Sequence, residues 1–495
     1  MNIAFASARL AVVAVAVSAV ATAQTPCAPQ WSALGAAPDG TVTALLALPD
    51  GHAIVGGQFV HLGGQLANYI AQWNGGSWSS MGPVTGVGFS NPVACLARAA
   101  NGDIIAGGAF TGPGTGIPLP IYSHVARWTG TLWQAMGGGI PSAVSAVACA
   151  PNGDIFAAAG YVYRWTSGNW QSLGPSGLPA WIPALVVRPN GELIAAANQL
   201  VVGGYAAGLA RWDGAAWTTS TVGAAGTLFS CALVLPDGDV VFGGQFASVG
   251  GVAANQVVRW NGTTFSPMGA GIGGGAVLAL TRLPNGDIIA GGSFTSAVPP
   301  FADYLARWDG TAWSAVGGGT DNAVAAATVF PDASLAVGGQ FGLAGGLPAP
   351  FAARWRPPCP AGVAVLGTGC VGSGGLNQLA AATGPWVGTT FHAVGTGMPA
   401  TGVVASVYGF TSMATPLAAL LPNGVPGCTL LVTPDDTRVL FPFAGGAESS
   451  LAIPNNAAIA GFVCYHQLVP LETDSVPLFT AVTSTNALAL TVGTY

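Results

Sequence analysis

The sequence predicts an all-β protein: a seven-bladed β-propeller closed by its N-terminal strand, followed by a C-terminal β-sandwich. Two patterns predict the propeller, a turn-and-strand motif and a tryptophan that recur in step along most of the chain. The composition agrees, because 75 Gly and 36 Pro among 495 residues, with only 12 basic and 18 acidic side chains, suit tight turns and strands better than helices. We expect a signal peptide over 1–23, the propeller over 24–359 and the sandwich over 360–495.

The repeated unit is clearest in residues 277–317, which begin VLALTRLPNGDIIAGGSF and end YLARWDGTAWSAVG. We predict four strands in it, and the Asn-Gly or Asp-Gly pairs between them favour tight hairpins. Four antiparallel strands repeated with a period of roughly 37 to 55 residues are typical of propeller blades. The first turn occurs seven times, as PDGH (49–52), ANGD (100–103), PNGD (151–154), PNGE (189–192), PDGD (236–239), PNGD (284–287) and PDAS (331–334).

The two ends of the repeat array predict a closed ring. The third-strand tryptophan occurs seven times, but the fourth-strand aromatic follows it only six times, because Trp355 is followed by RPPCP. Proline lacks an N–H and cannot continue a central strand. The missing fourth strand is found at the N-terminus, around Trp31, in the stretch QWSALG (30–35). An N-terminal strand that completes the last blade explains this offset.

Two cysteines give a second indication of closure. Cys27 lies four residues before Trp31, and Cys359 lies four residues after Trp355. If the two tryptophans face each other across an antiparallel pair, the cysteines also face each other within disulfide reach. We predict a Cys27–Cys359 disulfide, which in the loop-entropy model stabilises the ring by about 4 to 5 kcal/mol.

The repeat also carries glycines and charges at fixed positions. We expect the Gly-Gly of the second strand to let a neighbouring aromatic approach the backbone. Six of the 12 arginines precede the third-strand tryptophan, and an acid closes the first hairpin in five of those units. This spacing predicts cross-strand pairs, and the alternative, a ring of metal-binding acids, lacks the DxDxDG spacing of a calcium loop. The predicted pairs are Asp287 with Arg307, Asp239 with Arg259 and Asp103 with Arg127. The first unit has His52 and Gln72 at these positions, and the seventh keeps Arg354 opposite Ser334.

The loops divide between two faces. Turns after the first and third strands are short and uniform, whereas loops after the second and fourth strands vary in length and sequence. Binding residues concentrate on loops held by a rigid scaffold, so we place the ligand site on the variable-loop face. The candidates are His61, Asn68, Tyr122, His124, Tyr205, Asn255, Asp303 and Tyr304, and the alternative for each is an ordinary solvated loop residue.

Composition and the N-terminus restrict the class of protein. Arg9, the apolar run LAVVAVAVSAV (10–20) and Ala21-Thr22-Ala23 form an export signal with cleavage before Gln24, so we expect a secreted or periplasmic protein without a transmembrane segment. All basic residues are Arg, which excludes a Walker lysine or a Schiff base. The net charge of −6 argues against a nucleic-acid partner.

The tail holds alternating apolar runs separated by Gly, Pro and Asn, which predicts the β-sandwich. Within it VAVLGTGCVGSGG (363–375) imitates a dinucleotide fingerprint. The following stretch is too short for the helix that carries a pyrophosphate, so no nucleotide is expected. Cys370, Cys428 and Cys464 predict one disulfide, with the pairing open.

At the level of motifs, GGSF with ARWDGTAWSAVGGG is similar to kelch-like propellers and to the propeller of the fungal cortical polarity markers. It looks closest to secreted bacterial proteins built from this repeat. The tail, with GTGCVGSGG, IPNNAAIAGFVCYHQ and SxTNALALTVG, resembles a module that ends such proteins. The resemblance implies the fold over about residues 29–357 and says little about function.

The function that fits these features is a non-catalytic extracellular binding or adhesion protein, with a polysaccharide or protein ligand and no cofactor or metal. The alternative is a carbohydrate-active enzyme. A copper radical oxidase needs converging His, Tyr and Cys, but Cys95, Cys149 and Cys231 fall in first strands, where buried apolar thiols are expected. A glycosidase or lyase is the stronger form of this alternative, because Asp303 and Asp321 flank the variable-loop face.

Overall fold

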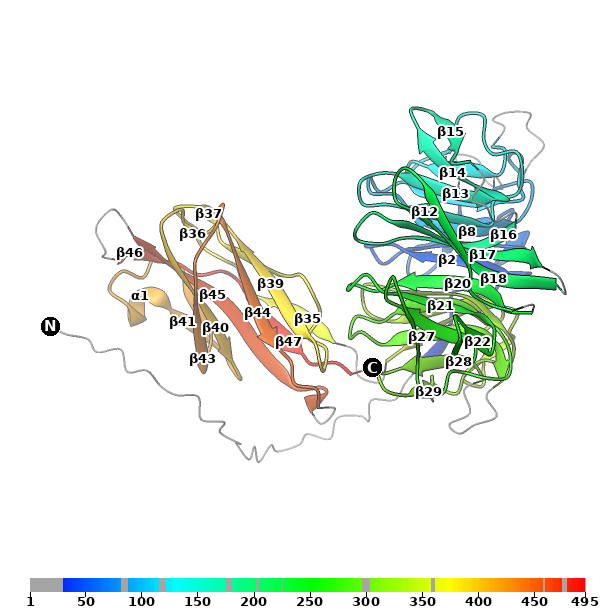
Figure 1. Cartoon of the computed structure of the whole chain (residues 1–495). Coiled ribbons are helices and arrows are strands. Elements are labelled where there is room, and N and C mark those ends of the chain that lie inside the picture. The colour runs from blue at the N-terminus through cyan, green and yellow to red at the C-terminus, as the bar shows by residue number, and fades with distance from the viewer. Residues whose placement is uncertain are drawn as a thin grey trace.

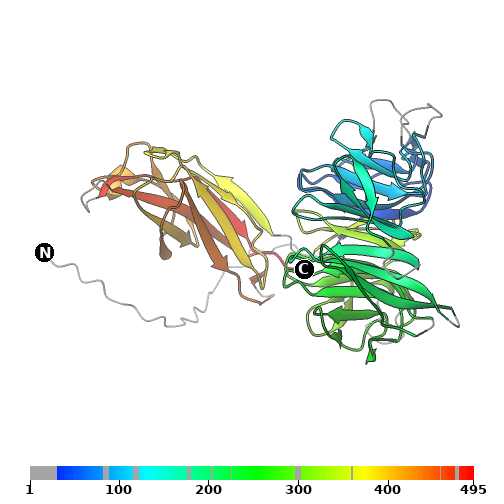
Figure 2. The same cartoon turned by 45° about the horizontal axis from the view of Figure 1, so that its top comes forward.

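The structure is a computed structural model. It describes residues 30–81, 88–114, 122–174, 180–201, 204–224, 226–295, 303–357, 361–456, 459–473 and 479–494. Within these ranges the chain is all-β apart from α1 (Leu417–Leu420). No sheet combines strands from residues 30–357 with strands from residues 361–494. Figures 1 and 2 show the second group, coloured yellow to red, gathered apart from the first. The export signal and Cys27 and Cys359 lie outside the described residues.

Seven four-stranded antiparallel sheets succeed one another along residues 30–357 (Figure 1). The first three are β2 (Val42–Ala47), β3 (Ala53–Gly57), β6 (Ile70–Trp73) and β7 (Trp78–Ser80); β8 (Val93–Arg98), β9 (Ile104–Gly108), β10 (Val125–Trp128) and β11 (Trp133–Ala135); and β12 (Ala146–Cys149), β13 (Ile155–Ala159), β14 (Tyr161–Thr166) and β15 (Asn169–Ser172). The fourth and fifth are β16 (Ala180–Val187), β17 (Leu193–Val201), β18 (Gly204–Trp212) and β19 (Trp217–Thr221); and β20 (Leu228–Val234), β21 (Val240–Gln245), β24 (Val257–Trp260) and β25 (Phe265–Pro267). The last two are β26 (Val277–Arg282), β27 (Ile288–Thr295), β28 (Asp303–Trp308) and β29 (Trp313–Ala315); and β30 (Val324–Val329), β31 (Leu335–Gly339), β34 (Ala352–Arg356) and β1 (Gln30–Ala33).

Three short ribbons occupy the loops between second and third strands. They are β4 (His61–Leu62) with β5 (Gln65–Leu66), β22 (Ser248–Val249) with β23 (Val252–Ala253), and β32 (Leu343–Ala344) with β33 (Leu347–Pro348). The first hairpin of each sheet makes a tight turn. In six sheets the third residue of this turn is a glycine in the left-handed conformation, as at Gly153 with φ +92°. In the seventh sheet Ala333 takes this conformation, with φ +61°.

The N-terminal strand belongs to the seventh sheet. β1 pairs antiparallel with β34, and Trp31 lies opposite Trp355. The same facing arrangement joins Trp308 and Trp313 in the sixth sheet. Outside the pair, the Leu34 amide donates a hydrogen bond to the Ala352 carbonyl over 3.1 Å. The fourth strand of the last sheet is therefore supplied from the start of the described chain.

Each sheet packs on the next through a buried apolar cluster, and the last packs on the first. Such clusters join sheets one to two, two to three, and so on through six to seven. A further cluster combines Val42 and Val55 of the first sheet with Phe330 and Ala336 of the seventh. The side chains of this interface are almost fully buried, so the two ends of the series share a core.

The second-strand glycines allow close approach by a valine of the next sheet and by the backbone of the first strand, as well as by the predicted aromatic. A Cβ built on Gly56 would lie 2.7 Å from Val93 Cγ1 of the next sheet, and one on Gly338 would lie 2.3 Å from Val42 Cγ1. The following glycine approaches the backbone of its own first strand, as at Gly57, where a Cβ would lie 2.2 Å from the Thr41 carbonyl oxygen. The expected aromatic also approaches the second glycine: a Cβ on Gly292 would lie 2.8 Å from Phe294 Cδ1, and one on Gly57 would lie 3.2 Å from Phe59 Cδ1.

The remaining residues form a six-stranded sheet and smaller sheets. The six strands are β35 (Gly362–Leu366), β47 (Ala487–Thr491), β45 (Val463–Thr473), β40 (Gly402–Gly409), β43 (Asp436–Leu440) and β46 (Phe479–Val482), which pairs with β45. The smaller sheets are β38 (Gln378–Ala381), β39 (Thr390–Thr396) and β44 (Gly446–Ala452); β36 (Val371–Gly372) and β37 (Gly375–Leu376); and β41 (Ser412–Pro416) and β42 (Thr429–Val432).

The core of this part lies between the three-stranded and six-stranded sheets, where Phe391 packs with Leu468 and Leu488. Cys370 and Cys428 form the disulfide, which resolves the pairing that the sequence left open, and Cys464 is a buried free thiol. The glycine-rich stretch after β35 forms the β36–β37 hairpin and no helix.

Candidate functional site

Charged side chains recur on the face of the tight turns. Arg307 Nε lies 2.5 Å from Asp287 Oδ2, Arg259 Nε lies 2.6 Å from Asp239 Oδ2, and Arg127 Nε lies 3.6 Å from Asp103 Oδ2. These are the three pairs that the spacing of the repeat predicts. In the first sheet, where both partners are replaced, Gln72 Nε2 lies 3.0 Å from His52 Nδ1. The paired acids and arginines thus connect the first hairpin of a sheet to its third strand.

The seventh sheet has an acid that the sequence reasoning missed. Arg354 Nε donates to Ser334 Oγ over 2.7 Å, and its terminal nitrogen pairs with Asp332. Asp332 is the second residue of its turn, and in the fifth sheet the second residue, Asp237, also contacts the arginine of its sheet. This shared position was the available signal. Burial lowers the pKa of Arg354 despite the attraction of Asp332, and its guanidinium lies over the ring of Phe330.

The eight residues predicted for the variable-loop face do not form one cluster. Asn68 and Tyr122 are buried, and burial raises the pKa of the Tyr122 hydroxyl. Tyr304 packs against the apolar cluster between sheets six and seven. Tyr205 lies in β18, but its side chain is outside the described residues. The segment 115–121 of the second-sheet loop is outside them as well.

A repeated backbone conformation explains several of these positions. The residue four before the third-strand tryptophan has a positive φ in five sheets, including His124 with φ +71° and Tyr304 with φ +62°. The His124 amide donates to the Phe110 carbonyl over 2.8 Å, and the Phe351 amide donates to Phe341 in the same way. His124 Nδ1 also lies 2.8 Å from the Ile140 carbonyl oxygen. These residues therefore have a structural role in starting the third strand.

Other candidates are hydrogen-bonded to residues of neighbouring loops. His61 Nδ1 lies 2.8 Å from Asp39 Oδ2. Burial acts to raise the pKa of Asp39, but hydrogen bonds from His61 and Val60 outweigh it and hold the pKa below its usual range. Asn255 Nδ2 donates to the Ala270 carbonyl over 2.7 Å.

The two acids of the glycosidase hypothesis have different environments. Asp303 is exposed at the start of β28. Asp321 Oδ1 accepts the amides of Gly342 and Leu343 over 2.7 and 2.9 Å. Asp321 therefore anchors the loop after the second strand, as Asp39 does in the first sheet through the amides of Val60 and His61.

Two exposed aromatics mark the variable-loop face of neighbouring sheets. Tyr161 starts β14 with 49% of its surface exposed, and Trp181 lies near the start of β16 with 55% exposed. First and third strands both begin on the variable-loop face, so the two residues lie on it. The sequence reasoning missed both, although the third unit has an unusually short loop that ends at Gly160, directly before Tyr161.

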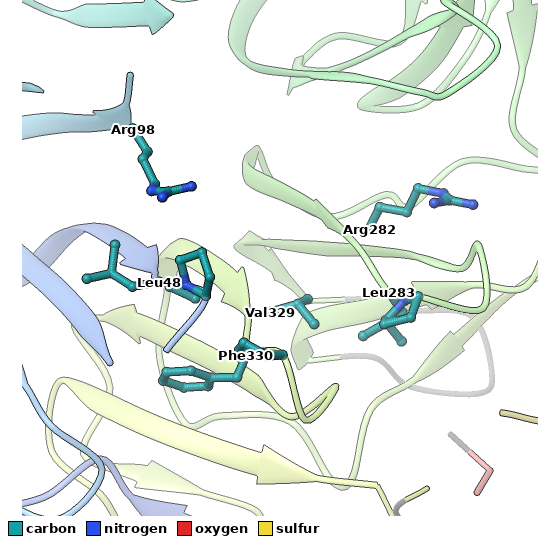
Figure 3. Close-up of a pocket in the computed structure, with 10 residues that line it drawn as sticks. Leu48, Arg98, Arg282, Leu283, Val329 and Phe330 are labelled. Carbon is teal, nitrogen blue, oxygen red and sulfur yellow. The ribbon is translucent and has the colours of Figure 1, made fainter. Parts of the chain in front are cut away.

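A pocket of about 400 Å³ lies on the opposite face, where first strands end in tight turns. It is lined by residues 47–49, 98, 282–284 and 329–331, from the first, second, sixth and seventh sheets. Figure 3 shows Arg98 and Arg282 on either side, with Val329 and Phe330 between them in this view. The variable-loop prediction did not include this pocket.

Titratable groups elsewhere are buried or partly buried. Burial raises the pKa of Cys95, Cys149 and Cys231 to about 12, so these first-strand thiols are poor nucleophiles. Burial lowers the pKa of His466 to about 4, and its Nε2 lies 2.7 Å from Ser449 Oγ. Across the described ranges, no three His, Cys, Asp or Glu side chains gather as a metal site would require. None of the described helices has the length and apolar character of a membrane span.

Comparisons with known proteins give structural likeness only. No family model and no curated protein sequence matches the chain. The extracellular domain of a putative one-component system from B. thetaiotaomicron is 12% identical, over 76% of this chain and 45% of that one, with a TM-score of 0.47. Virginiamycin B lyase from Staphylococcus aureus is 12% identical, over 66% of this chain and 98% of that one, with a TM-score of 0.45. The WD40 β-propeller domain of Doa1 is 11% identical, over 65% of this chain and 94% of that one, with a TM-score of 0.42. The chain spans less than half the length of the first of these.

Proposed function

We propose that this protein is an exported, non-catalytic binding or adhesion protein that holds a polysaccharide or protein ligand on its variable-loop face. The observation that carries the proposal is the exposure of Tyr161 and Trp181 at the loop ends of neighbouring sheets. Large aromatic side chains supply much of the energy of many binding surfaces, because they bury a large apolar area and carry a polar group at one edge. Polysaccharide is the first ligand class to test, since aromatic faces stack on sugar rings without needing charge.

We propose that the ligand surface is carried by a closed, seven-bladed, kelch-like propeller over residues 24–359, and that a β-sandwich follows over 360–495. The core shared by the first and seventh sheets supports closure. The register supports the predicted disulfide, because Gln30 lies opposite Arg356 and Trp31 opposite Trp355. Continued by three residues, this register would place Cys27 opposite Cys359.

Export is supported by the signal sequence and by the Cys370–Cys428 disulfide. Disulfides persist in oxidising compartments and are rare in the cytosol. A secreted or periplasmic location is therefore part of the proposal.

The test is retention of the protein, from Gln24 onward, on a panel of insoluble and immobilised polysaccharides. The proposal expects retention on one member, with a loss of about tenfold in affinity for Trp181→Ala and a smaller loss for Tyr161→Ala. Phe443→Ala is the matched control, because Phe443 is an exposed aromatic of the C-terminal part, with 88% of its surface exposed.

Retention that is equal for all three variants would reject the aromatic surface as the site. If the protein is retained on none of the polysaccharides, a polysaccharide ligand is rejected. A screen of secreted proteins for a complex lost in Trp181→Ala would then decide the protein alternative.

A further inference from the structure

Of the eleven arginines in the described residues, Arg98, Arg282 and Arg356 contact no acid, and the first two line the pocket. Arg98 and Arg282 occupy the same repeat position, two residues before the first turn, and both are exposed. Neither takes part in a hydrogen bond or an ion pair with any residue that the structure describes. Eight other arginines, at 127, 164, 188, 211, 259, 307, 354 and 438, each contact an acid.

Arg188, directly before the turn of another sheet, does have partners. It lies directly before the turn of the fourth sheet, where its guanidinium donates to Glu192 over 2.8 Å and to the Gly238 carbonyl over 2.7 Å. The acids nearest in sequence to the two free arginines are already paired, Asp103 with Arg127 and Asp287 with Arg307. Arg98 and Arg282 therefore leave two positive charges without a counter-charge among the described residues.

Both arginines line the same apolar pocket. Its floor consists of Leu48, Leu283, Val329 and Phe330, of which Leu283 and Phe330 are buried. About 400 Å³ is within the range of small-molecule sites, which are mostly apolar with a few polar groups that fix orientation. An arginine presents a planar fork of donors that matches a carboxylate and also stacks on aromatic faces.

We propose that this pocket, on the opposite face from the proposed ligand surface, is a second binding site for a small organic anion with an apolar body and one or two carboxylates. The apolar body lies on Leu48 and Val329, and Arg98 and Arg282 hold the carboxylates. The site is independent of the proposed function, because it shares no residue with Tyr161 or Trp181.

The test uses three rigid probes of similar shape: naphthalene-2,6-dicarboxylate, naphthalene-2-carboxylate and the neutral naphthalene-2-carboxamide. Their binding to the full exported chain is measured by titration calorimetry at low salt. Saturable binding of one anion per chain is expected, with the amide at least tenfold weaker. Arg98→Gln and Arg282→Gln should each weaken binding of the dicarboxylate about fivefold.

Arg356→Gln is the control, because Arg356 is also exposed and outside the pocket; it should leave the affinity unchanged. Added salt should weaken binding of the two carboxylates and leave binding of the neutral amide unchanged. Equal binding of amide and carboxylate would overturn the anion assignment, and an equal loss in all three variants would overturn the site. Absence of saturation by both anions at millimolar concentration would overturn the proposal itself. Thermal unfolding of each variant, expected to match the parent, shows that the fold is kept.

Discussion

At the residue scale, the repeated Asp–Arg pair is a local device that ties a hairpin to a third strand. In the pair of Asp287 and Arg307 the side chains retain only 10% and 26% of their exposure. The carboxylate of Asp287 also accepts the Asn285 side-chain amide over 2.9 Å. A partly buried pair with additional hydrogen bonds loses more when broken than an exposed pair does.

We therefore expect Asp287→Asn to lower the free energy of unfolding by about 2 kcal/mol, because Arg307 keeps its charge without a counter-charge. Asp436→Asn is the control, since Asp436 and Arg438 are about half exposed, and its effect should stay below about 0.5 kcal/mol. Urea unfolding of both variants measures the difference. Equal effects would mean that the repeated pair contributes no more than a surface contact.

At the element scale, the first hairpin of each sheet depends on a left-handed third residue. Gly153 has φ +92°, and a Cβ built on it would meet nothing within 4 Å, so only the backbone conformation opposes a side chain there. The left-handed conformation costs an L-residue about 1 to 2 kcal/mol. The seventh sheet bears this cost at Ala333.

Gly153→Ala should accordingly lower the free energy of unfolding by about 1 kcal/mol. Gly138 is the matched comparison: a Cβ there also meets nothing within 4 Å, but its backbone does not have the left-handed φ. Gly138→Ala should be neutral or slightly stabilising. Thermal unfolding of the two variants separates the cost of the backbone conformation from that of steric contact. An equal loss of stability in both variants would contradict the argument from backbone strain.

At the scale of the whole molecule, the contact between the first and seventh sheets decides whether the series closes. Gly338 of the seventh sheet approaches Val42 of the first as closely as Gly291 of the sixth approaches Val324 of the seventh. Neighbouring sheets in the series and the two terminal sheets therefore use the same packing. A closed ring requires this equivalence.

Gly338→Ala should destabilise the protein by about 2 kcal/mol through overpacking, and Val42→Ala in the same chain should relieve much of that loss. The pair Gly291→Ala and Val324→Ala should show the same coupling in a double-mutant cycle of unfolding free energies. Additive effects for Gly338 and Val42, beside coupling for Gly291 and Val324, would mean that the ring is open in solution.

The features that the sequence predicted are those that act within one repeat. The turn glycines, the facing tryptophans and the pairing of Asp287 with Arg307 depend on strand spacing and hairpin register, which a period of residues reveals directly. The facing of Trp31 and Trp355 was also predictable, because the missing fourth strand of the last unit had to be supplied from somewhere.

Tertiary structure decided the features that depend on contacts between repeats. The sequence could not show that Gly338 meets a valine of the first sheet. The exposure of Trp181 and the pocket between Arg98 and Arg282 also arise only when the sheets pack. The physical reason is that hairpins are specified by local backbone preferences, whereas burial, exposure and pocket shape depend on side chains brought together from distant parts of the chain.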